Sequence, residues 1–194
     1  MAISLLLASA SPRRRQLLRA AGFEFESVRS SIAEKFDSNL TLFELTTFNA
    51  THKGMSVARR HPEKVVLAAD TLVALEDQVI GKPADMREAL EILRRLSGRV
   101  HDVCTAVFIC HRAEKRAVTF CEKSSVQFRR LTSNMIRDYL ARINPLDKAG
   151  AYAAQGAGAE IIARIDGSFT NVVGLPMERT VVELGRFGLR PRSA

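Results

Sequence analysis

The chain has 194 residues, of which 46% are hydrophobic, and this composition excludes a disordered protein. No repeat, linker or low-complexity block divides it, so we expect a single domain over residues 1–194. The formal net charge of +8 permits polyanionic partners, but the basic residues are spread out with few aromatic residues among them. We therefore expect no stable nucleic-acid partner. No apolar run reaches the length of a membrane span, so we expect no membrane partner either.

The cysteines and the N-terminal run bear on location. Cys104, Cys110 and Cys121 form no CxxC pair and are odd in number, which is typical of reduced thiols in ordinary strands. The run Ile3 to Leu7, followed by Ala8-Ser9-Ala10, has the form of a short signal peptide. It lacks a basic residue in front, and its apolar core is short. We therefore expect a cytoplasmic protein.

The first predicted elements are a short strand and a helix. Leu5 to Ala8 form an apolar run that is too short for an ordinary helix. Ser11 is suited to cap the helix that follows, and Pro12 fits its first position, where no N–H is needed. Three arginines, residues 13–15, then lie where the helix dipole is already positive. The pattern fits a phosphate site and a solvated basic helix equally well.

The rest of the chain alternates strands and helices. The apolar run Val65 to Ala69 predicts a central strand buried on both faces, which ends at Asp70 and Thr71. A polar stretch between two long strand-like runs indicates a hairpin, and therefore a mixed α/β sheet. Up to residue 96 we expect a strand over 23–28, a polar loop over 29–40, a helix over 42–60 capped by Thr41, an extended piece over 72–75 and a helix opened by Asp85. Beyond it we expect strands over 100–109 and 117–128, a helix over 133–142 capped by Ser133, a strand over 159–165, an extended piece over 168–173 and a final helix from Pro176 to about Phe187.

Few polar residues stand out by position alone. Asp70 follows a buried strand, and ligands of α/β folds gather beyond the carboxyl ends of strands, so a functional role is favoured over the capping of a turn. Lys82 lies in Gly81-Lys82-Pro83, where the flanking residues restrict the backbone, but such turns are common. Lys53 fits a solvated lysine on an amphipathic helix, and Glu34 in its loop carries no signal of its own.

Several well-known motifs are missing from the sequence. There is no GxxxxGK[ST] loop, and Gly156 and Gly158 lack the strand–turn–helix setting of a dinucleotide fingerprint. No HExxH or tight histidine cluster indicates zinc, and no nucleophile elbow supports a Ser-His-Asp triad. These absences argue against a P-loop nucleotidase, a dinucleotide-binding domain, a zinc hydrolase and a serine hydrolase.

Short motifs do occur in a characteristic order along almost the whole chain. They are residues 7–14 (LASASPRR), 69–71 (ADT), 81–83 (GKP), 96–99 (LSGR), 147–152 (DKAGAY), 155–156 (QG) and 171–176 (NVVGLP). Together they resemble the Maf family of nucleoside triphosphate pyrophosphatases. The resemblance implies a mixed, strongly twisted central sheet flanked by helices, with two lobes and a nucleotide cleft, as in Maf and ITPase-like proteins. It also implies hydrolysis between the α and β phosphates, which yields a nucleoside monophosphate and pyrophosphate.

The DKAGAY and QG segments resemble the family branch that acts on dTTP and UTP, and modified pyrimidine nucleotides are further candidates. The branch that prefers 7-methyl-GTP carries different residues there, and its preference stays an alternative. Gln155 maps to base discrimination, because its amide offers both a donor and an acceptor to a pyrimidine edge. Arg13 and Thr71 map to the other specificity positions of the family.

The resemblance also implies roles in catalysis. Asp70 is the implied proton acceptor, and Glu34 and Asp70 are the implied ligands of Mg²⁺ or Mn²⁺, hard cations that favour oxygen. The two roles of Asp70 compete, because a carboxylate bound to a cation is a poorer base. The residues implied to bind the triphosphate substrate are Ser9, Ser11, Arg13, Lys53, Thr71, Lys82 and Gln155.

Two positions depart from the family pattern. Ala33 stands where a second acid is often found, which leaves Glu34 as the single carboxylate at that point of the loop, and Gly54 stands where alanine is usual. A homodimer is implied by the resemblance alone. The link of the family with septum formation leaves a cell-division regulatory protein as an alternative function, which would tolerate the loss of Asp70.

Overall fold

A computed structural model of the chain describes residues 4–37, 39–76 and 78–192. Its sheet has seven strands in the order β2-β1-β3-β5-β6-β7, and β4 pairs with β3 beside this path. β1 is parallel to β2 and β3, and the other pairings are antiparallel, so the predicted mixed α/β sheet is confirmed. The strands are β1 (Leu5–Leu7), β2 (Glu26–Ser27), β3 (Val65–Leu75), β4 (Gln78–Ile80), β5 (Val100–His111), β6 (Arg116–Phe128) and β7 (Ile162–Asp166).

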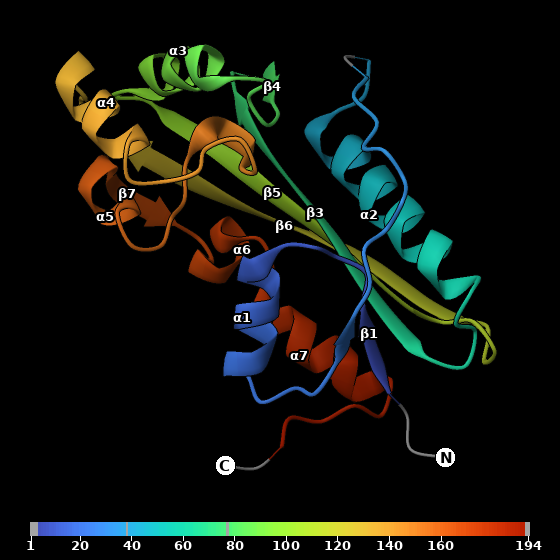
Figure 1. The fold of residues 1–194 in the computed structure, drawn as a ribbon. Coiled ribbons are helices and arrows are strands. Elements are labelled where there is room, and N and C mark those ends of the chain that lie inside the picture. The colour runs from blue at the N-terminus through green and yellow to red at the C-terminus, as the bar shows by residue number, and fades with distance from the viewer. Residues whose placement is uncertain (1–3, 38, 77, 193–194) are drawn as a thin grey trace.

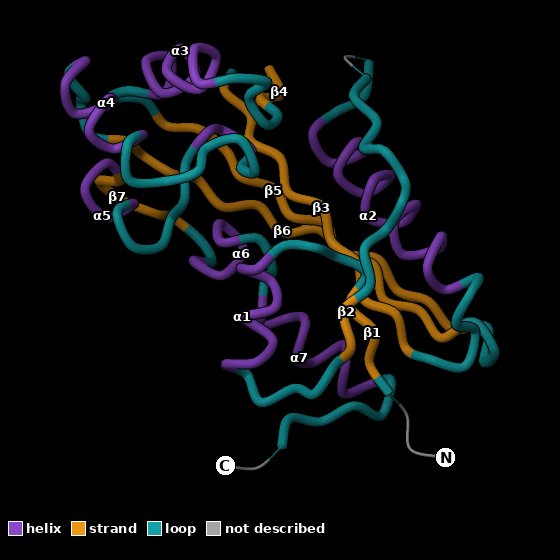
Figure 2. Tube along the Cα trace, viewed as in Figure 1, coloured by secondary structure: helices purple, strands orange, loops and turns teal. Residues whose placement is uncertain are grey.

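Helices lie on both faces of the sheet and at its far end (Figure 1). The long strands β3, β5 and β6 cross the whole molecule and twist as they do so (Figure 2). α3 and α4 lie at one end of these strands, and α1, α2 and α7 at the other. The helices are α1 (Pro12–Ala20), α2 (Leu42–Ala58), α3 (Met86–Leu96), α4 (Ser133–Leu140), the 3₁₀ turn η1 (Ala149–Ala151), α5 (Gly158–Ile161), α6 (Phe169–Val173) and α7 (Met177–Arg186).

Side-chain capping fixes most of the helix starts that the sequence predicts. Ser11, Thr41 and Asp85 each accept a hydrogen bond from the backbone N–H three residues on, and Glu44 completes a capping box with Thr41. The prediction is off by one residue at α4, where Thr132, not Ser133, accepts the bond from Met135. Both hydroxyls suit a cap, and only the backbone geometry decides between them.

Two segments predicted to be extended are helical. Within the predicted extended piece 168–173, residues 169–173 form α6, because the Ser168 hydroxyl accepts a bond from the N–H of Asn171 and Gly174 ends the turn with a φ of 124°. Residues 158–161 form α5, so the strand predicted from residue 159 begins only at Ile162. The strand expected over residues 23–28 is also shorter, since only β2 pairs with β1.

The cysteine prediction is wrong for two of the three residues. Cys104 on β5 and Cys121 on β6 form a disulfide, with Cα atoms 6.7 Å apart, while Cys110 is a free, buried thiol. In the hairpin register Cys121 faces Ala106, so the two cysteines are diagonal neighbours on one face of the sheet. Their spacing in the chain does not reveal this register.

The strand β3 is longer than predicted, and this changes the position of Asp70. The sequence argument ends a strand at Ala69 and places Asp70 beyond it, whereas Asp70 and Thr71 lie in the middle of an eleven-residue strand. One edge of β3 pairs with β5 from Val65 to Ala74. The other edge pairs with β1 only over residues 65–67 and with β4 only over residues 73–75. Residues 68–72 therefore have no strand partner on that edge among the described residues.

Three buried clusters surround this open stretch. Alternate residues of β3 up to Ala69 pack against α1 and α7, and Val66 and Ala68 pack against α2 on the opposite face. From Val73 onward the strand joins a third cluster with α3 and α4. The polar pair Asp70 and Thr71 lies where these clusters meet.

None of the helices in the described part of the chain combines the length and the apolar composition needed to cross a bilayer. Ile3, the first residue of the signal-like run, lies outside the described residues, as do both ends of the predicted domain 1–194.

Candidate functional site

A cavity of about 490 Å³ opens beside the unpaired edge of β3. This volume suits a small-molecule ligand. Its walls come from the β1–α1 turn, the loop before α2, the Gly81-Lys82-Pro83 turn and the segment 147–154. Of the residues that the sequence analysis assigns to the site, Ser9, Ser11, Arg13, Glu34, Lys53, Asp70, Thr71 and Lys82 line this cavity.

Asp70 is buried against the middle of α2. Its side chain is 4% exposed, and its Oδ1 lies 2.5 Å from Nζ of Lys53. Asn49 lies one helical turn before Lys53, and its Nδ2 donates to the other carboxylate oxygen at 3.3 Å. A cation and an amide thus compensate the burial of this carboxylate.

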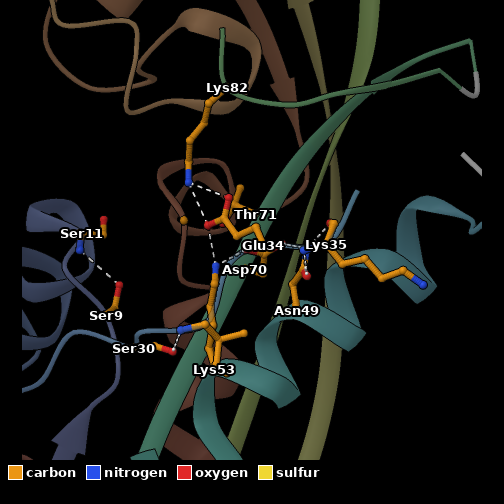
Figure 3. A network of polar contacts seen from close by, with 12 residues as sticks. Ser9, Ser11, Ser30, Glu34, Lys35, Asn49, Lys53, Asp70, Thr71 and Lys82 are labelled. Atoms are coloured by element: carbon orange, nitrogen blue, oxygen red, sulfur yellow. Dashed lines mark hydrogen bonds and ion pairs between the residues drawn. The ribbon is translucent and has the colours of Figure 1, made fainter. Parts of the chain in front are cut away.

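Glu34 lies between two lysines. Lys53 donates to it at 2.7 Å from α2, and Lys82 donates to both of its oxygens at 2.8 Å from the turn on the other side (Figure 3). Burial disfavours the ionised form of Glu34, but the charges and hydrogen bonds of Lys53 and Lys82 outweigh it and lower the pKa of this carboxyl to about 2. Glu34 is therefore ionised at neutral pH, and it bridges the two lysines across the cavity.

The loop that carries Glu34 is fixed to α2 by one side chain. Asn49 Oδ1 accepts from the backbone N–H of Lys35 at 2.8 Å, and its Nδ2 donates to the carbonyl of Lys35 at 3.0 Å. The Lys35 side chain itself points away from the Glu34 cluster (Figure 3). Asn49 therefore holds both Asp70 and the neighbour of Glu34 in place.

Arg14, rather than Arg13, penetrates deepest into the polar wall at the start of α1. It donates from Nε to the carbonyl of Gly174 at 2.8 Å, from Nη1 to Ser9 Oγ at 3.3 Å and from Nη2 to Thr71 Oγ1 at 2.9 Å. Burial lowers the pKa of Arg14, against the charges of Asp70 and Glu34, but a guanidinium stays charged at neutral pH. The sequence analysis did not single out this arginine.

Arg13 lies on the rim of the cavity instead. Its Nη1 is 3.2 Å from Oδ2 of Asp147, which also pairs with Lys148. Burial opposes the ionisation of Asp147, but Lys148 and Arg13 prevail and hold the pKa of Asp147 below its usual range. Part of the positive charge of the DKAGAY segment and of Arg13 is thus neutralised within the protein.

The back of the cavity contains an aromatic group that the sequence analysis missed. Tyr152 lines the cavity, and its hydroxyl lies 2.8 Å from Nε2 of the buried His101. Both rings pack edge-on against each other and against Phe128. Burial lowers the pKa of His101 to about 4, so its ring is neutral at pH 7. The pair anchors the DKAGAY segment to the sheet.

Gln155 is the one predicted site residue that does not line the cavity. It lies directly after Ala154, which does line it, and it is partly exposed. Its role in base recognition stays a prediction.

Two carboxylates, Glu34 and Asp70, share the ammonium group of Lys53 at the site. In the described ranges, no three His, Cys, Asp or Glu side chains gather into a group that would hold a metal ion alone. Two carboxylates suit Mg²⁺ or Mn²⁺ when a phosphorylated substrate and water supply the remaining oxygens. The donor set thus fits a cation that binds together with its substrate.

Comparison with known proteins places these features in a family. A family model described as Maf-like protein matches residues 4–187. A dTTP/UTP pyrophosphatase of Bacillus pumilus is 43% identical over 187 residues, which is 96% of this chain and 98% of that protein. The dTTP/UTP pyrophosphatase of Bacillus velezensis is 41% identical over 96% of this chain and 97% of that protein. Among solved structures, a HAM1 protein from Coxiella burnetii aligns with a TM-score of 0.41 and 14% identity, over 67% of this chain and 75% of that one.

Proposed function

This chain belongs to the Maf family, and from that premise we propose that it is a single-domain nucleoside triphosphate pyrophosphatase that hydrolyses dTTP and UTP. The relatives named dTTP/UTP pyrophosphatase match nearly the full length of the chain and support this substrate class. The observation that carries the proposal is the cavity in which Lys53 lies between Asp70 and Glu34. It combines a buried carboxylate with cations suited to a triphosphate.

The charge of the cavity supports triphosphate binding. Lys53, Lys82 and Arg14 line one space, and the hydroxyls of Ser9 and Ser11 lie at the start of α1. A triphosphate carries about four negative charges at neutral pH, and preorganised cations stabilise the charge that develops during phosphoryl transfer. Lys53 and Lys82 now bond to Glu34, so we expect phosphate oxygens to compete with Glu34 for the two ammonium groups.

Asp70 is the proposed proton acceptor. It takes a proton from the attacking water, whose oxygen bonds to phosphorus as the bridge between the α and β phosphates breaks. The products are a nucleoside monophosphate and pyrophosphate, and the electron pair of the broken bond stays on the leaving phosphate oxygen. Nζ of Lys53 lies 2.5 Å from Oδ1 of Asp70 and orients this carboxylate before the substrate binds.

Glu34 and Asp70 are the proposed ligands of Mg²⁺ or Mn²⁺. When bound, the cation supplies further positive charge to the phosphate oxygens. Lys53 pairs with both carboxylates and holds them close to each other before a cation binds.

Specificity for pyrimidines is assigned to Gln155, Thr71 and Arg13. Thr71 and Arg13 line the cavity, and Gln155 follows a lining residue. We further expect a homodimer that works in the cytoplasm, where nucleoside triphosphates are made.

The test is a panel of nucleoside triphosphates assayed for pyrophosphate release, with Mg²⁺, with Mn²⁺ and with neither. The expected result is metal-dependent release from dTTP and UTP with the monophosphate as the second product. Release of orthophosphate, or a preference for 7-methyl-GTP, would contradict the assignment. A protein inactive on the whole panel, but able to bind a nucleotide, would favour the regulatory alternative.

A further inference from the structure

A line of hydroxyl groups runs from the cavity into the core behind Asp70. Thr71 on β3 and Thr105 on β5 are register partners, and their Oγ1 atoms lie 2.9 Å apart. Arg14 Nη2 donates to Thr71 Oγ1 at 2.9 Å, and Thr105 Oγ1 donates to the carbonyl of Asn171 at 3.0 Å. Thr71 lines the cavity, whereas Thr105 is fully buried.

Both ends of this line are fixed by further contacts. Arg14 also donates to the carbonyl of Gly174 and to Ser9. Asn171 is fully buried, and its Nδ2 donates to the carbonyl of Val103 and to Ser124 Oγ. The two threonines therefore lie between a fixed donor and a fixed acceptor. From residue 67 to 75, the remaining residues on the same face of β3 as Thr71 are apolar, namely Leu67, Ala69, Val73 and Leu75. The threonine pair therefore lies in an otherwise apolar row.

The chemistry of the two ends sets the direction of the hydrogen bonds. A guanidinium only donates, a carbonyl only accepts, and a hydroxyl has one hydrogen. When Thr105 gives its hydrogen to Asn171, it accepts one from Thr71, and Thr71 in turn accepts from Arg14. All three bonds are then made within the protein. The reverse direction breaks the bond to Asn171 and requires a partner in the cavity for the Thr71 hydrogen.

We propose that Thr105 is a positioning residue that keeps Thr71 a hydrogen-bond acceptor, so that the cavity selects a nucleotide presenting a donor group to Thr71. The inference rests on the proposed function and names a recognition rule for that substrate. The hydrogen of Thr71 is committed to Thr105, and one acceptor position remains on its oxygen after Arg14 has bound. The matching donor is an imide N–H of the pyrimidine ring or a hydroxyl of the sugar.

The rule predicts discrimination against substrates without that donor. A site built around one hydrogen bond rejects an analogue that leaves a buried polar group unpaired. Replacing Thr105 by the isosteric valine frees the Thr71 hydrogen, which then turns toward the cavity. The rejection should disappear, while Lys53, Lys82 and Asp70 stay in place.

The experiment compares kcat/KM for dTTP, for dTTP methylated at ring N3 and for 2′,3′-dideoxy-TTP. The wild-type protein should lose about tenfold with one of the two analogues, close to the 1.4 kcal/mol of a single hydrogen bond, and that analogue identifies the donor. Thr105→Val should shrink this ratio to about twofold or less, and Thr105→Ser should restore it.

The matched control is Thr180→Val. Thr180 is fully buried like Thr105 and donates to the carbonyl of Pro176 at 2.7 Å, but it lies in α7 and does not line the cavity. Its variant should keep the wild-type ratio. A purely structural effect of losing a buried threonine hydroxyl would change stability in both variants without changing the ratio.

An unchanged ratio in Thr105→Val, or a wild-type protein that accepts both analogues like dTTP, would overturn the inference. If Thr105→Val does not fold, Thr71→Val removes the acceptor itself, and a wild-type ratio in that variant is equally fatal. Loss of turnover on every triphosphate would overturn the proposed function, and the inference with it, and is therefore distinct from turnover with an unchanged ratio.

Discussion

Asp70 and Thr71 are neighbours on β3, but they face two differently built surroundings. Asp70 points toward α2 and belongs to a chain of charges, from Lys53 to Glu34 to Lys82, whose outer members are 38% and 44% exposed. Thr71 points toward α1 and α6 and belongs to a buried, neutral chain of hydroxyls that starts at one arginine. Both residues line the same cavity because they lie in the stretch 68–72 of β3, which has no strand partner on this edge among the described residues.

The difference separates chemistry from recognition. Charges that reach solvent exchange partners easily, because water and phosphate oxygens replace an exposed ion pair at little cost. A buried hydrogen-bond chain is costly to disturb, since a broken bond leaves a polar group unpaired. We infer that the Asp70 side rearranges around phosphates, whereas the Thr71 side stays fixed and reads the nucleoside.

The largest expected effect is the loss of turnover when Asp70, the proposed general base on the charged side, is replaced. Asp70→Asn is expected to reduce kcat for dTTP by about 10⁴-fold, the upper range for loss of a general base, because an amide cannot take the proton. Pyrophosphate release measures the loss, and circular dichroism checks the fold. Asp102→Asn is the matched control, since Asp102 also pairs with a lysine on the sheet but lies outside the cavity. Near-normal turnover in Asp70→Asn would remove Asp70 from the mechanism.

Removing the ammonium group of Lys53, which Asp70 and Glu34 share, should destabilise the folded protein. Lys53→Met leaves Asp70 buried without its ion-pair partner, and we expect the free energy of unfolding to fall on the order of 4 kcal/mol. Urea unfolding at pH 7 measures it. Lys64→Met, which breaks the pair with the exposed Glu26, should change the free energy of unfolding far less than Lys53→Met. Equal effects in the two variants would contradict the buried role of Lys53.

Acid should lower the free energy of unfolding through His101, which bonds to Tyr152 at the back of the cavity. The unfolded chain binds a proton at this residue below about pH 6.5, whereas the folded protein binds it only near pH 4. Stability is therefore fully present above pH 6.5 and is lost as the pH falls toward 4, by roughly 3 kcal/mol for a shift of this size. His101→Gln does not titrate and should flatten this dependence in urea unfolding. A slope unaffected by His101→Gln would refute the argument.

The smallest expected effect concerns recognition of the nucleobase by Gln155. Gln155→Glu places a carboxylate near the proposed base site and removes its N–H donors, so kcat/KM for dTTP and UTP should fall about fivefold relative to purine triphosphates, or roughly 1 kcal/mol. Competition assays with mixed nucleotides give the ranking directly. Gln127→Glu, an exposed change on β6, serves as the control. An unaltered ranking would leave Thr71 as the better candidate for base recognition.

Local signals in the sequence predicted most of the elements but not the way they meet. Capping residues and apolar runs located α1, α2, α3 and the β5–β6 hairpin, because those signals act within a few residues. The prediction of an extended piece over 168–173 is wrong. The β-branched residues of this segment favour a strand, while the Ser168 cap and the buried Asn171 favour a helical turn.

The site was predicted in part for a mistaken reason. The sequence predicts Asp70 as the residue after a strand, whereas it lies inside one, where an edge with no strand partner among the described residues provides the opening. The choice between Arg13 and Arg14 depends on the direction of α1 over the cavity, and the pairing of Thr71 with Thr105 depends on the register of β3 and β5. Long-range geometry of this kind leaves no mark in local composition.

The open edge of β3 also bears on how this protein behaves at high concentration. Free strand edges are the places where chains stick to one another and start to aggregate. Here the gap spans only residues 68–72, about 17 Å of strand at roughly 3.3 Å per residue, and β1 and β4 close it at either end. An incoming strand would have to fit between them and next to Asp70 and Lys53. The geometry that opens the cavity thereby protects this stretch of β3 from pairing with a strand of another chain.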